Sequence, residues 1–571
     1  MSLFYNGKLW VTPATMSKVD DSAYQSANLG VGNYAAFIGT SAGGEPNTPL
    51  AFSSPAEAKA ALISGPLLDA ITKAFAPSAE TGGPSTVYAV RVNPAVQATL
   101  ALKDTAGADS ILLKSSDYGQ WTNQIKTKIE SGSVSGLMVT TQYQNGYVTQ
   151  DNIARPALTV QYTGAQANAA MTVSGTSIVL QAPSGTTVAT VDLHVYSTYQ
   201  QVVDYINTID GFSAGVVDPN NINAVALNGL DYATAANVKT QYTVTANLQA
   251  VIDWFNSGSE GLVTATRAPD AGTVPALLPF TYLAGGSNGV TSTPEWSAAF
   301  TTLQSVDAQW ICPVSTTPAI WAMADAHVQF MSKFGRLERR AVCGTDLGTS
   351  DAAAIAFAKA LNSDRTSLVH LGHYGYDVNG NLALFNASYT AAMLTGMFAG
   401  VNPGTALSNK SINVSGLERN LRNPTDTDAL ITGGVLCIES TKNGYKVVQS
   451  ISTWLVDKKF NKVEQSCGWA TDYTARTVRE ALDVLRGQKN NQVNLGRAAT
   501  ITDTVLKALS VAEPAGSGVL AGDKANPPYM GITVTASGDT LAVAFQCSPV
   551  IPINYIPVSI SLKIFTGTAS A

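Results

Sequence analysis

Charged residues are scarce in this chain. Asp, Glu, Lys and Arg make up 13% of its 571 residues, about half of the roughly 25% that soluble domains usually carry. The net charge is −6 and no run of Lys and Arg stands out, so the sequence has no electrostatic signature of a nucleic-acid-binding protein. A sparsely charged surface is typical of a subunit that other subunits cover. We favour that interpretation over its alternative, a neutral extracellular or viral monomer.

Paired cysteines and long apolar runs are also missing. No Cys-x-x-Cys pair is present, and an odd count of widely spaced cysteines does not indicate a secreted disulfide framework. We expect buried thiols at the five cysteines, Cys312, Cys343, Cys437, Cys467 and Cys547. The chain does not open with a basic segment and an apolar core, which predicts no signal peptide, and no run of about 18 apolar residues predicts a membrane span. We expect a protein that is made in a cytoplasm and stays soluble until it assembles.

Catalytic motifs find little support. Gly348-Thr349-Ser350 before an alanine-rich stretch is similar to the nucleophile segment of subtilisin-like proteases, but the same tripeptide occurs at 39–41 and 175–177. Ser350 is explained as the N-cap of a helix that starts at Asp351. The loops around the histidines supply no Asp/His/Ser constellation for acyl transfer; the four histidines are His194, His327, His370 and His373. We therefore predict no catalytic residue and no enzyme.

Metal and nucleotide motifs are equally weak. His370 and His373 are three residues apart at a predicted strand end, a spacing that suits a metal only on a helix, and no third ligand is evident. Structural hydrogen bonds are the preferred explanation for both. Gly43-Gly44 follows a strand, but no Gly-Lys-Ser/Thr completes a phosphate loop. We predict neither a metal nor a cofactor.

The two ends of the chain carry the clearest pattern. From 558 to 564 apolar and polar residues alternate, and Val558, Ile560, Leu562 and Ile564 share one face of a predicted strand. Prolines at 549 and 552 keep the preceding segment extended. At the other end, a turn at 6–7 precedes a second short apolar run. We predict that both ends add strands to neighbouring subunits, with Leu9 and Val11 contributing at the N-terminus. This points to assembly rather than catalysis.

The length suggests two to four domains. Strand and helix patterns alternate in two stretches, which predicts a largely parallel sheet with covered faces. Between them lies material rich in Thr, Val, Gly and Ser with short β-like runs. The predicted division is an N-terminal arm at 1–28, an α/β core at 29–95 and 286–510, an inserted β-rich domain at 96–184, an inserted α+β domain at 185–285, and a C-terminal β segment and arm at 511–571.

Local signals place the elements of the predicted core. Ser54-Pro55-Ala56-Glu57 is a well-formed helix start, Asn443-Gly444 predicts a hairpin between 435–439 and 445–454, and the helix around 391–399 is apolar on almost every side. Strands are expected at 34–39, 86–92, 309–314, 340–344 and 367–372, and helices at 318–334, 351–361 and 389–401. A helix at 472–485 has the apolar stripe Ala475, Val478, Leu482 and Leu485, with Arg476, Arg479 and Arg486 on its polar face.

In this order the segments resemble the tail sheath proteins of contractile phages. Each similar stretch is weak alone, but together they span nearly the whole chain. They are 30–44 with the helix after Ser54, 88–93, Tyr118-Gly119-Gln120-Trp121-Thr122-Asn123, Leu283-Ala284-Gly285-Gly286-Ser287-Asn288-Gly289, 391–400, 447–454 and the final strand.

The resemblance implies a subtilisin-like α/β core without its active site, inserted β-rich domains that face outward, and arms that exchange strands. It implies hexameric rings stacked around a tail tube, partnership with baseplate and tail terminator proteins, and contraction that drives the tube through the host envelope. Such a protein is part of the virion tail and assembles in the host cytoplasm. Arg476, Arg479 and Arg486 would face the tube.

Three alternatives stay open at this point. One is the sheath of a phage-tail-like particle. A second is another self-assembling shell or surface-layer protein, for which low charge and adhesive termini are equally expected. An α/β hydrolase-type enzyme would need a triad that the sequence does not reveal.

Overall fold

The computed structural model describes residues 3–5, 8–10, 34–217, 229–257, 261–513, 515–564 and 566–567. Its centre is a seven-stranded sheet that is parallel except at one edge. The strand order is β26 (Val435–Leu436), β22 (Thr366–Val369), β21 (Arg340–Gly344), β20 (Trp310–Pro313), β3 (Tyr34–Gly39), β5 (Thr86–Arg91) and the antiparallel β4 (Pro49–Phe52).

Helices cover both faces of this sheet, as the alternating pattern predicts. One face packs on α2 (Pro66–Phe75) and α8 (Ala387–Gly400). The other packs on α5 (Thr293–Thr302), α6 (Pro318–Phe330) and α7 (Asp351–Leu361). The buried helix predicted around 391–399 is confirmed, since α8 is buried along almost its whole length. The protein is therefore a mixed α/β protein with a mostly parallel central sheet.

The caps and turns that position these elements follow the local sequence. In α1 (Pro55–Leu62) the Ser54 side chain accepts a hydrogen bond from the backbone N–H of Glu57, as predicted. The Asn443-Gly444 turn joins β27 (Ile438–Thr441) to β28 (Gly444–Val447). The predicted first hairpin strand is wrong at its start, because Val435 and Leu436 pair instead with β22 at the edge of the parallel sheet.

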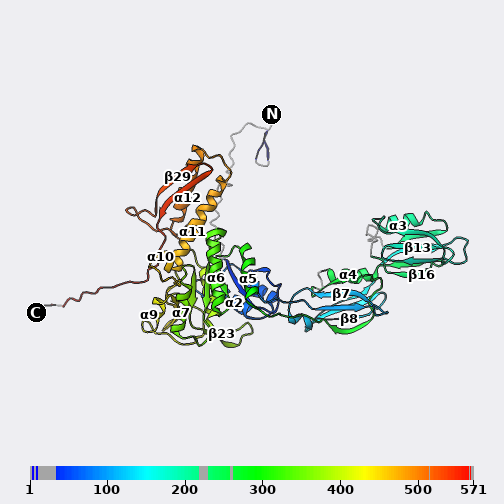
Figure 1. The fold of residues 1–571 in the computed structure, drawn as a ribbon, viewed down its shortest axis with the longest axis horizontal. Coiled ribbons are helices and arrows are strands. Elements are labelled where there is room, and N and C mark those ends of the chain that lie inside the picture. Colours follow the sequence, from blue (N-terminus) through cyan, green and yellow to red (C-terminus); the bar gives the residue numbers. More distant parts are fainter. Residues whose placement is uncertain are drawn as a thin grey trace.

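Residues 96–285 form several small antiparallel sheets that extend to one side of the core (Figure 1). One hydrophobic cluster joins residues of 98–153 and 248–283 and includes α4 (Asn247–Asn256). A second joins residues of 157–244 and includes α3 (Tyr199–Ile206). The second cluster thus lies, in sequence, inside the first, a grouping that differs from the predicted division at residue 184. The strands are β6 (Thr99–Lys103), β7 (Asp109–Ser115), β8 (Lys126–Ser131), β9 (Leu137–Tyr143), β10 (Gly146–Ile153), β11 (Pro156–Tyr162), β12 (Ala170–Val173), β13 (Ser177–Gln181), β14 (Thr187–Asp192), β15 (Phe212–Val216), β16 (Ala233–Asn237), β17 (Tyr242–Thr245), β18 (Val263–Arg267) and β19 (Leu278–Tyr282).

A small C-terminal region stands above the core in the view of Figure 1. It consists of two 18-residue helices, α11 (Gln465–Leu482) and α12 (Gln492–Leu509), and the hairpin β29 (Tyr529–Ser537) and β30 (Thr540–Cys547). These elements share their own hydrophobic cluster. The helix predicted at 472–485 is present, but it begins earlier and its last residues, Asp483–Leu485, form a 3-10 turn.

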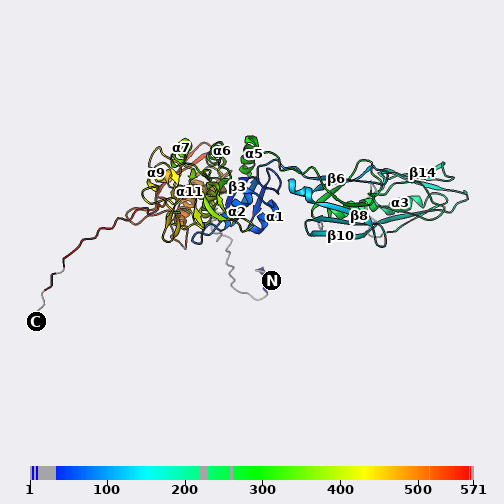
Figure 2. The same cartoon turned by 90° about the horizontal axis from the view of Figure 1, so that it is seen from below.

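The described residues at the two ends of the chain form different structures. At the N-terminus β1 (Leu3–Tyr5) pairs antiparallel with β2 (Lys8–Trp10), and Phe4 lies opposite Leu9. Val11, which we predicted to contribute to an inter-subunit strand, lies outside the described residues. The C-terminal segment runs away from the body as an extended arm (Figure 2). It forms no strand with any other described part of the chain, and its apolar side chains are exposed, with Leu562 at 93%.

Candidate functional site

The residues first considered for catalysis serve the fold. Ser350 caps α7 by accepting a hydrogen bond from the backbone N–H of Ala353, as predicted. His373 bonds through Nδ1 to Thr390 Oγ1 at 2.9 Å, and burial lowers the pKa of His373 to about 3.

Four of the cysteines are buried and Cys547 is half-buried. Within the described ranges no three His, Cys, Asp or Glu side chains gather into a possible metal site, and no helix there could span a membrane.

Sequence reasoning missed one chain of catalytic residue types. His370 lies between a hydroxyl and a carboxylate, with Nδ1 3.1 Å from Thr345 Oγ1 and Nε2 2.9 Å from Asp351 Oδ1. The three residues come from the ends of two neighbouring strands and the start of α7, which only the parallel topology brings together. Thr345 and His370 are almost completely buried, so a substrate has no access to the hydroxyl. Burial also lowers the pKa of His370. The arrangement therefore fixes α7 to the strand ends.

Buried ion pairs hold α11 against the core. Asp472 accepts from Arg340 Nη2 at 2.9 Å and from Arg365 Nη1 at 2.8 Å. Arg340 also donates to Gln465 Oε1 at 2.7 Å. Gly468 packs on the Arg340 guanidinium so closely that a β-carbon there would overlap it. The start of α11 is thus locked to the strands of the central sheet.

The arginines predicted on the polar face of this helix have different surroundings. Arg476, predicted on the polar face that would meet the tube, is 5% exposed and bonds to Asp307 and Glu480 of its own subunit. Burial alone would lower the pKa of Arg476, but the bonds to Asp307 and Glu480 outweigh it and raise the pKa. Arg479 donates to Glu338 at 2.6 and 2.7 Å. Arg486 is exposed and pairs with Asp483 at 2.7 Å.

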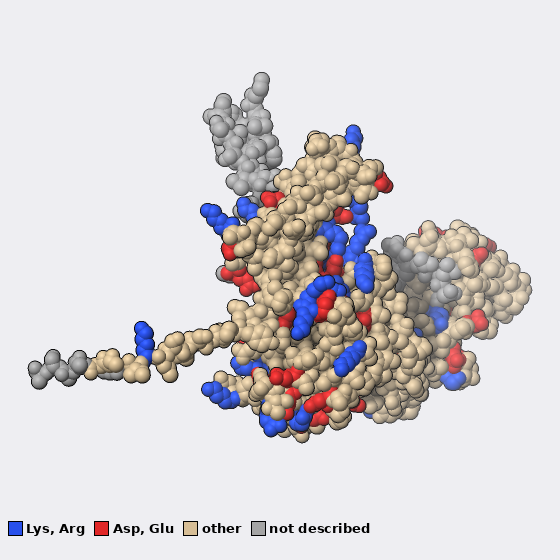
Figure 3. All heavy atoms as spheres, turned by 60° about the vertical axis from the view of Figure 1, so that its left-hand side comes forward, with Lys and Arg blue, Asp and Glu red and all other residues tan. Residues whose placement is uncertain are grey.

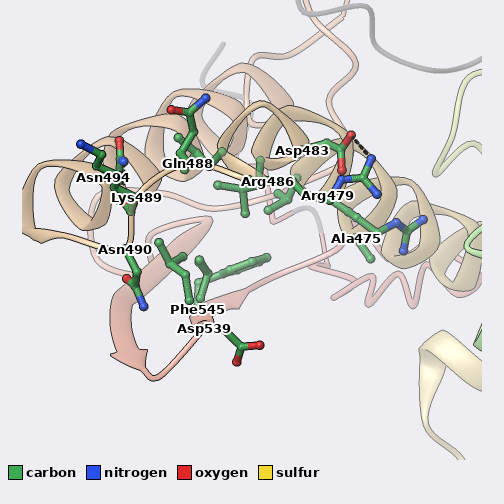
Figure 4. Close-up of a pocket in the computed structure, with 16 residues that line it drawn as sticks. Ala475, Arg479, Asp483, Arg486, Gln488, Lys489, Asn490, Asn494, Asp539 and Phe545 are labelled. Carbon is green, nitrogen blue, oxygen red and sulfur yellow. Dashed lines mark hydrogen bonds and ion pairs between the residues drawn. The ribbon is translucent and has the colours of Figure 1, made fainter.

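A groove of about 620 Å³ separates the end of α11 from the hairpin (Figure 4). Its walls combine an apolar floor with a polar rim. The floor includes Val478 and Leu482 of α11 and the same-face residues of β30, Leu541, Val543 and Phe545. The rim includes Arg479, Arg486, Lys489 and Asp539. A strand-like segment with one apolar face matches a groove of this composition.

The hairpin that borders the groove has free edges. β29 and β30 form a two-stranded sheet, and within the described chain neither strand pairs with a third. Unpaired backbone donors and acceptors of this kind accept strands from other chains. The alternation in 529–547 around Gly538 was the signal that would have identified this hairpin from sequence, where only a β segment was predicted.

The C-terminal arm begins beside the same region. Ala521 N–H donates to Ser548 O and Val550 N–H to Val519 O, so the first residues of the arm are fixed to the body. Within the described part of the arm the last fixed point is Asn554, whose Nδ2 donates to Glu464 Oε1 at 2.7 Å. Beyond Asn554 the predicted strand residues Val558, Ile560, Leu562 and Ile564 are 75–93% exposed. Residues 548–564 carry one charged side chain, Lys563 (Figure 3).

Sequence comparisons identify relatives over most of the chain, although no family model matches it. The tail sheath protein of Bacillus phage SP01 is 28% identical over 575 residues, which cover 97% of this chain and 96% of that protein. The tail sheath protein of Staphylococcus phage Twort is 24% identical over 517 residues, covering 82% and 84%.

The fold gives a concordant result. A sheath tail protein from Listeria innocua superposes with a TM-score of 0.56 at 12% identity, covering 91% of this chain and 92% of that one. At this identity the likeness concerns the fold alone. The curated relatives and the shared fold agree over nearly the full length. The chain therefore belongs to the family of phage tail sheath proteins, which are structural components of the virion tail and not enzymes.

Proposed function

We propose that this chain polymerises into a contractile sheath of stacked hexameric rings around a tail tube. Shortening of the sheath then drives the tube through the host envelope. The observation that carries the proposal is the pairing of two unsatisfied features on one subunit. One is an arm with a single apolar face, and the other is a hairpin with free edges beside an apolar groove. Each is complementary to the other on a neighbouring copy.

The strand-exchange step follows from this complementarity. In an isolated subunit the arm exposes Val558, Ile560, Leu562 and Ile564 to water. Addition of this arm to the β29–β30 hairpin of another subunit satisfies backbone groups at the hairpin edge and buries the apolar face. Burial of an aliphatic side chain contributes about 1.5–3 kcal/mol. The N-terminal arm with Leu9 and Val11 is proposed to add a further strand in the same way.

The α/β core is proposed to be subtilisin-like and to move as a rigid body during contraction. Its parallel sheet, covered on both faces, supports this assignment. The β-rich insertions are proposed to face outward from the particle, with the division between them set by the two nested hydrophobic clusters. A baseplate triggers contraction and a terminator closes the opposite end.

Tube attachment is proposed for the end of α11. Of the three arginines on its polar face, Arg476 and Arg479 already bond to carboxylates of their own subunit. Arg486 is exposed at the groove rim and is the side chain best placed for an acidic tube surface. Arg486→Glu is expected to weaken binding of the sheath to tubes, and unchanged binding would count against this role.

The arm provides the decisive test of polymerisation. Ile560→Asp with Leu562→Asp would bury charge at the joint, so we expect a folded monomer that makes no tubes. Ser559→Asp with Ser561→Asp places the same charges on the opposite face and is the matched control. Circular dichroism reports folding and electron microscopy of the purified protein reports tubes. Normal tubes from the Ile560/Leu562 variant would overturn strand exchange through this face.

The same micrographs separate the alternatives. Hollow contracted tubes support a sheath, whereas flat lattices would indicate a surface-layer protein. A phage tail and a phage-tail-like particle would both give tubes, and capsid genes beside this gene would distinguish them.

A further inference from the structure

A second apolar surface lies at the carboxyl edge of the central sheet. It is formed by β23 (His373–Tyr376) and β24 (Leu382–Phe385), where Tyr374 lies opposite Leu384 and Tyr376 opposite Leu382. All four side chains point to the same exposed face, and Tyr376 is 62% exposed. We call these four residues the carboxyl-edge patch. An exposed apolar patch on a small sheet is typical of an interaction site.

The sheet that carries the patch is held rigidly from behind. Lys73 donates to Tyr376 O at 2.8 Å and lies over the Phe385 ring at 3.7 Å. The His373 ring stacks on Phe385 and bonds to Thr390. These contacts join the hairpin to α2 and α8. A preorganised surface loses little conformational entropy when it binds.

An exposed aromatic pair lies at the amino edge of the same sheet. Phe330 and Phe334 have ring centroids 5.7 Å apart, and Phe334 is 72% exposed. Phe330 directly precedes the π-helical turn Met331–Gly335 at the end of α6 and Phe334 lies within it, and such turns occur often at functional sites. Arg479 of α11 fixes the loop by donating to Arg336 O at 2.8 Å. We call Phe330 and Phe334 the amino-edge pair.

The two surfaces lie at opposite ends of the core. The amino-edge pair is next to α11, whereas Figure 1 places β23 at the far end of the core from α11 and α12. Their charged surroundings differ in sign. Asp346 and Asp377 accompany the carboxyl-edge patch, and hydrogen bonds from Asn381 and Asn379 lower the pKa of Asp377. Lys333 and Arg336 are exposed beside the amino-edge pair.

Other cations near the carboxyl edge are already engaged. Arg419 bonds to Asp351 at 2.5 Å, Lys73 donates to Tyr376 O, and Lys59 lies 3.5 Å from Val378 O. The acidic side chains there are therefore opposite in charge to Lys333 and Arg336, whose side chains have no hydrogen-bond or ion-pair partner among the described residues. Each charged group lies beside an apolar centre. Opposite charges around apolar centres favour one register of contact over others.

We propose that the carboxyl-edge patch of one subunit binds the amino-edge pair of a second copy. This inference rests on the proposed polymer and adds a core-to-core contact that does not involve the arms. Because the two surfaces differ and lie at opposite ends, the contact is head-to-tail and continues from subunit to subunit. It would keep neighbouring cores in register while the arms keep them connected.

Disulfide trapping in the full-length polymer tests the contact. Tyr376→Cys combined with Phe334→Cys is expected to give covalent ladders of dimers and higher species on oxidation. Tyr147→Cys combined with Phe334→Cys, which pairs Phe334 with a similarly exposed tyrosine of the β-rich insertion, is the matched control and reports background from native thiols. Ladders no stronger than this control in well-formed polymers would overturn the proposal.

Charge exchange provides the second measurement. Tyr376→Asp is expected to reduce polymer yield roughly tenfold, and adding Phe334→Arg is expected to restore it. Tyr147→Asp should leave the yield unchanged. A Tyr376→Asp variant that polymerises normally, or a loss that Phe334→Arg does not rescue, contradicts the contact. Electron micrographs of the unmodified chain test the sheath itself: polymers without tube shape would refute the proposed function while trapping would still decide this contact.

Discussion

The central sheet buries its apolar side chains within the subunit, whereas the C-terminal arm leaves its apolar side chains exposed. Every strand of the central sheet pairs within the subunit, and its two hydrophobic clusters are almost completely buried. The arm has the same alternation of apolar residues as a buried strand, yet its side chains are exposed. Stability and assembly are therefore carried by different residues. A change in the core should unfold the subunit, whereas a change in the arm should alter only what the subunit builds.

The strongest challenge to the folded side of this comparison is Asp472→Ala. The substitution leaves Arg340 and Arg365 at the base of α11 without their shared carboxylate. Loss of one partner of a buried ion pair costs about 3–5 kcal/mol. We expect a large fall in the free energy of unfolding, measured by urea denaturation.

An exposed ion pair supplies the control. Asp483→Ala removes the partner of the exposed Arg486, and surface pairs contribute about 0–1 kcal/mol. Equal losses from the two variants would mean that the pairs under α11 do not hold it to the core.

A smaller effect is expected from Gly468→Ala. The new methyl group overlaps the Arg340 guanidinium, which Asp472 and Gln465 hold in place. Overpacking of this kind costs about 1–3 kcal/mol. Gly496→Ala on α12 has no atom within 4 Å of the new methyl group, and Ala is a better helix former than Gly by roughly 1 kcal/mol. Thermal melting should move in opposite directions for the two variants, and a shared direction would contradict the packing argument.

Much of the core was predictable because its signals are local. The bounds of β3, β21 and α7 agree with the sequence pattern, as do the caps at Ser54 and Ser350. Each depends on residues that are neighbours in the chain. The mostly parallel sheet follows from the alternation of such elements.

The missed features depend on contacts between distant residues. Arg476 has the sequence environment of a solvated helix face, and the partner that it bonds to in its buried position, Asp307, is 169 residues away in the sequence. The hydrogen bonds of His370 to Thr345 and Asp351 form only because the ends of two strands lie next to each other in the sheet. The two nested insertions have similar amino-acid compositions. No change in composition therefore marks the point near residue 248 where the chain rejoins the hydrophobic cluster that begins at residue 98. Val435 has the pattern of a hairpin strand, but the sheet edge offers a better partner.

The join between core and arm is expected to respond weakly to pH. Glu464 Oε1 accepts from Asn554 and Gln449, while the buried Oε2 has no hydrogen-bond partner among the residues that the structure describes. Burial raises the pKa of Glu464 above its usual value of 4.5. The folded state therefore binds this proton more tightly than the unfolded state. Its contribution to stability is present below pH 4.5 and is lost as pH rises through the folded pKa.

Glu464→Gln isolates this contribution, because an amide keeps the acceptor for Asn554 without a titrating proton. The variant should match the parent chain in acid and exceed its stability at neutral pH, by about 1.4 kcal/mol for each pKa unit of the shift. Denaturation at a series of pH values measures the difference. A constant difference across that series would exclude titration of Glu464.

The smallest effect on stability, with a large effect on assembly, is expected from Ile560→Ala combined with Leu562→Ala. Both side chains are at least 80% exposed in the subunit, so their removal should change the free energy of unfolding by no more than about 0.5 kcal/mol. In the polymer each contributes about 1.5–3 kcal/mol if the arm is buried in a neighbour. Even the lower values add to about 3 kcal/mol, which corresponds to more than a hundredfold rise in the concentration needed for polymerisation. Light scattering against concentration measures that threshold, and calorimetry measures the melting temperature. The comparison between core and arm fails if the melting temperature falls sharply, since the arm would then complete its own subunit. It fails equally if the threshold stays the same, since the arm would then carry no assembly energy.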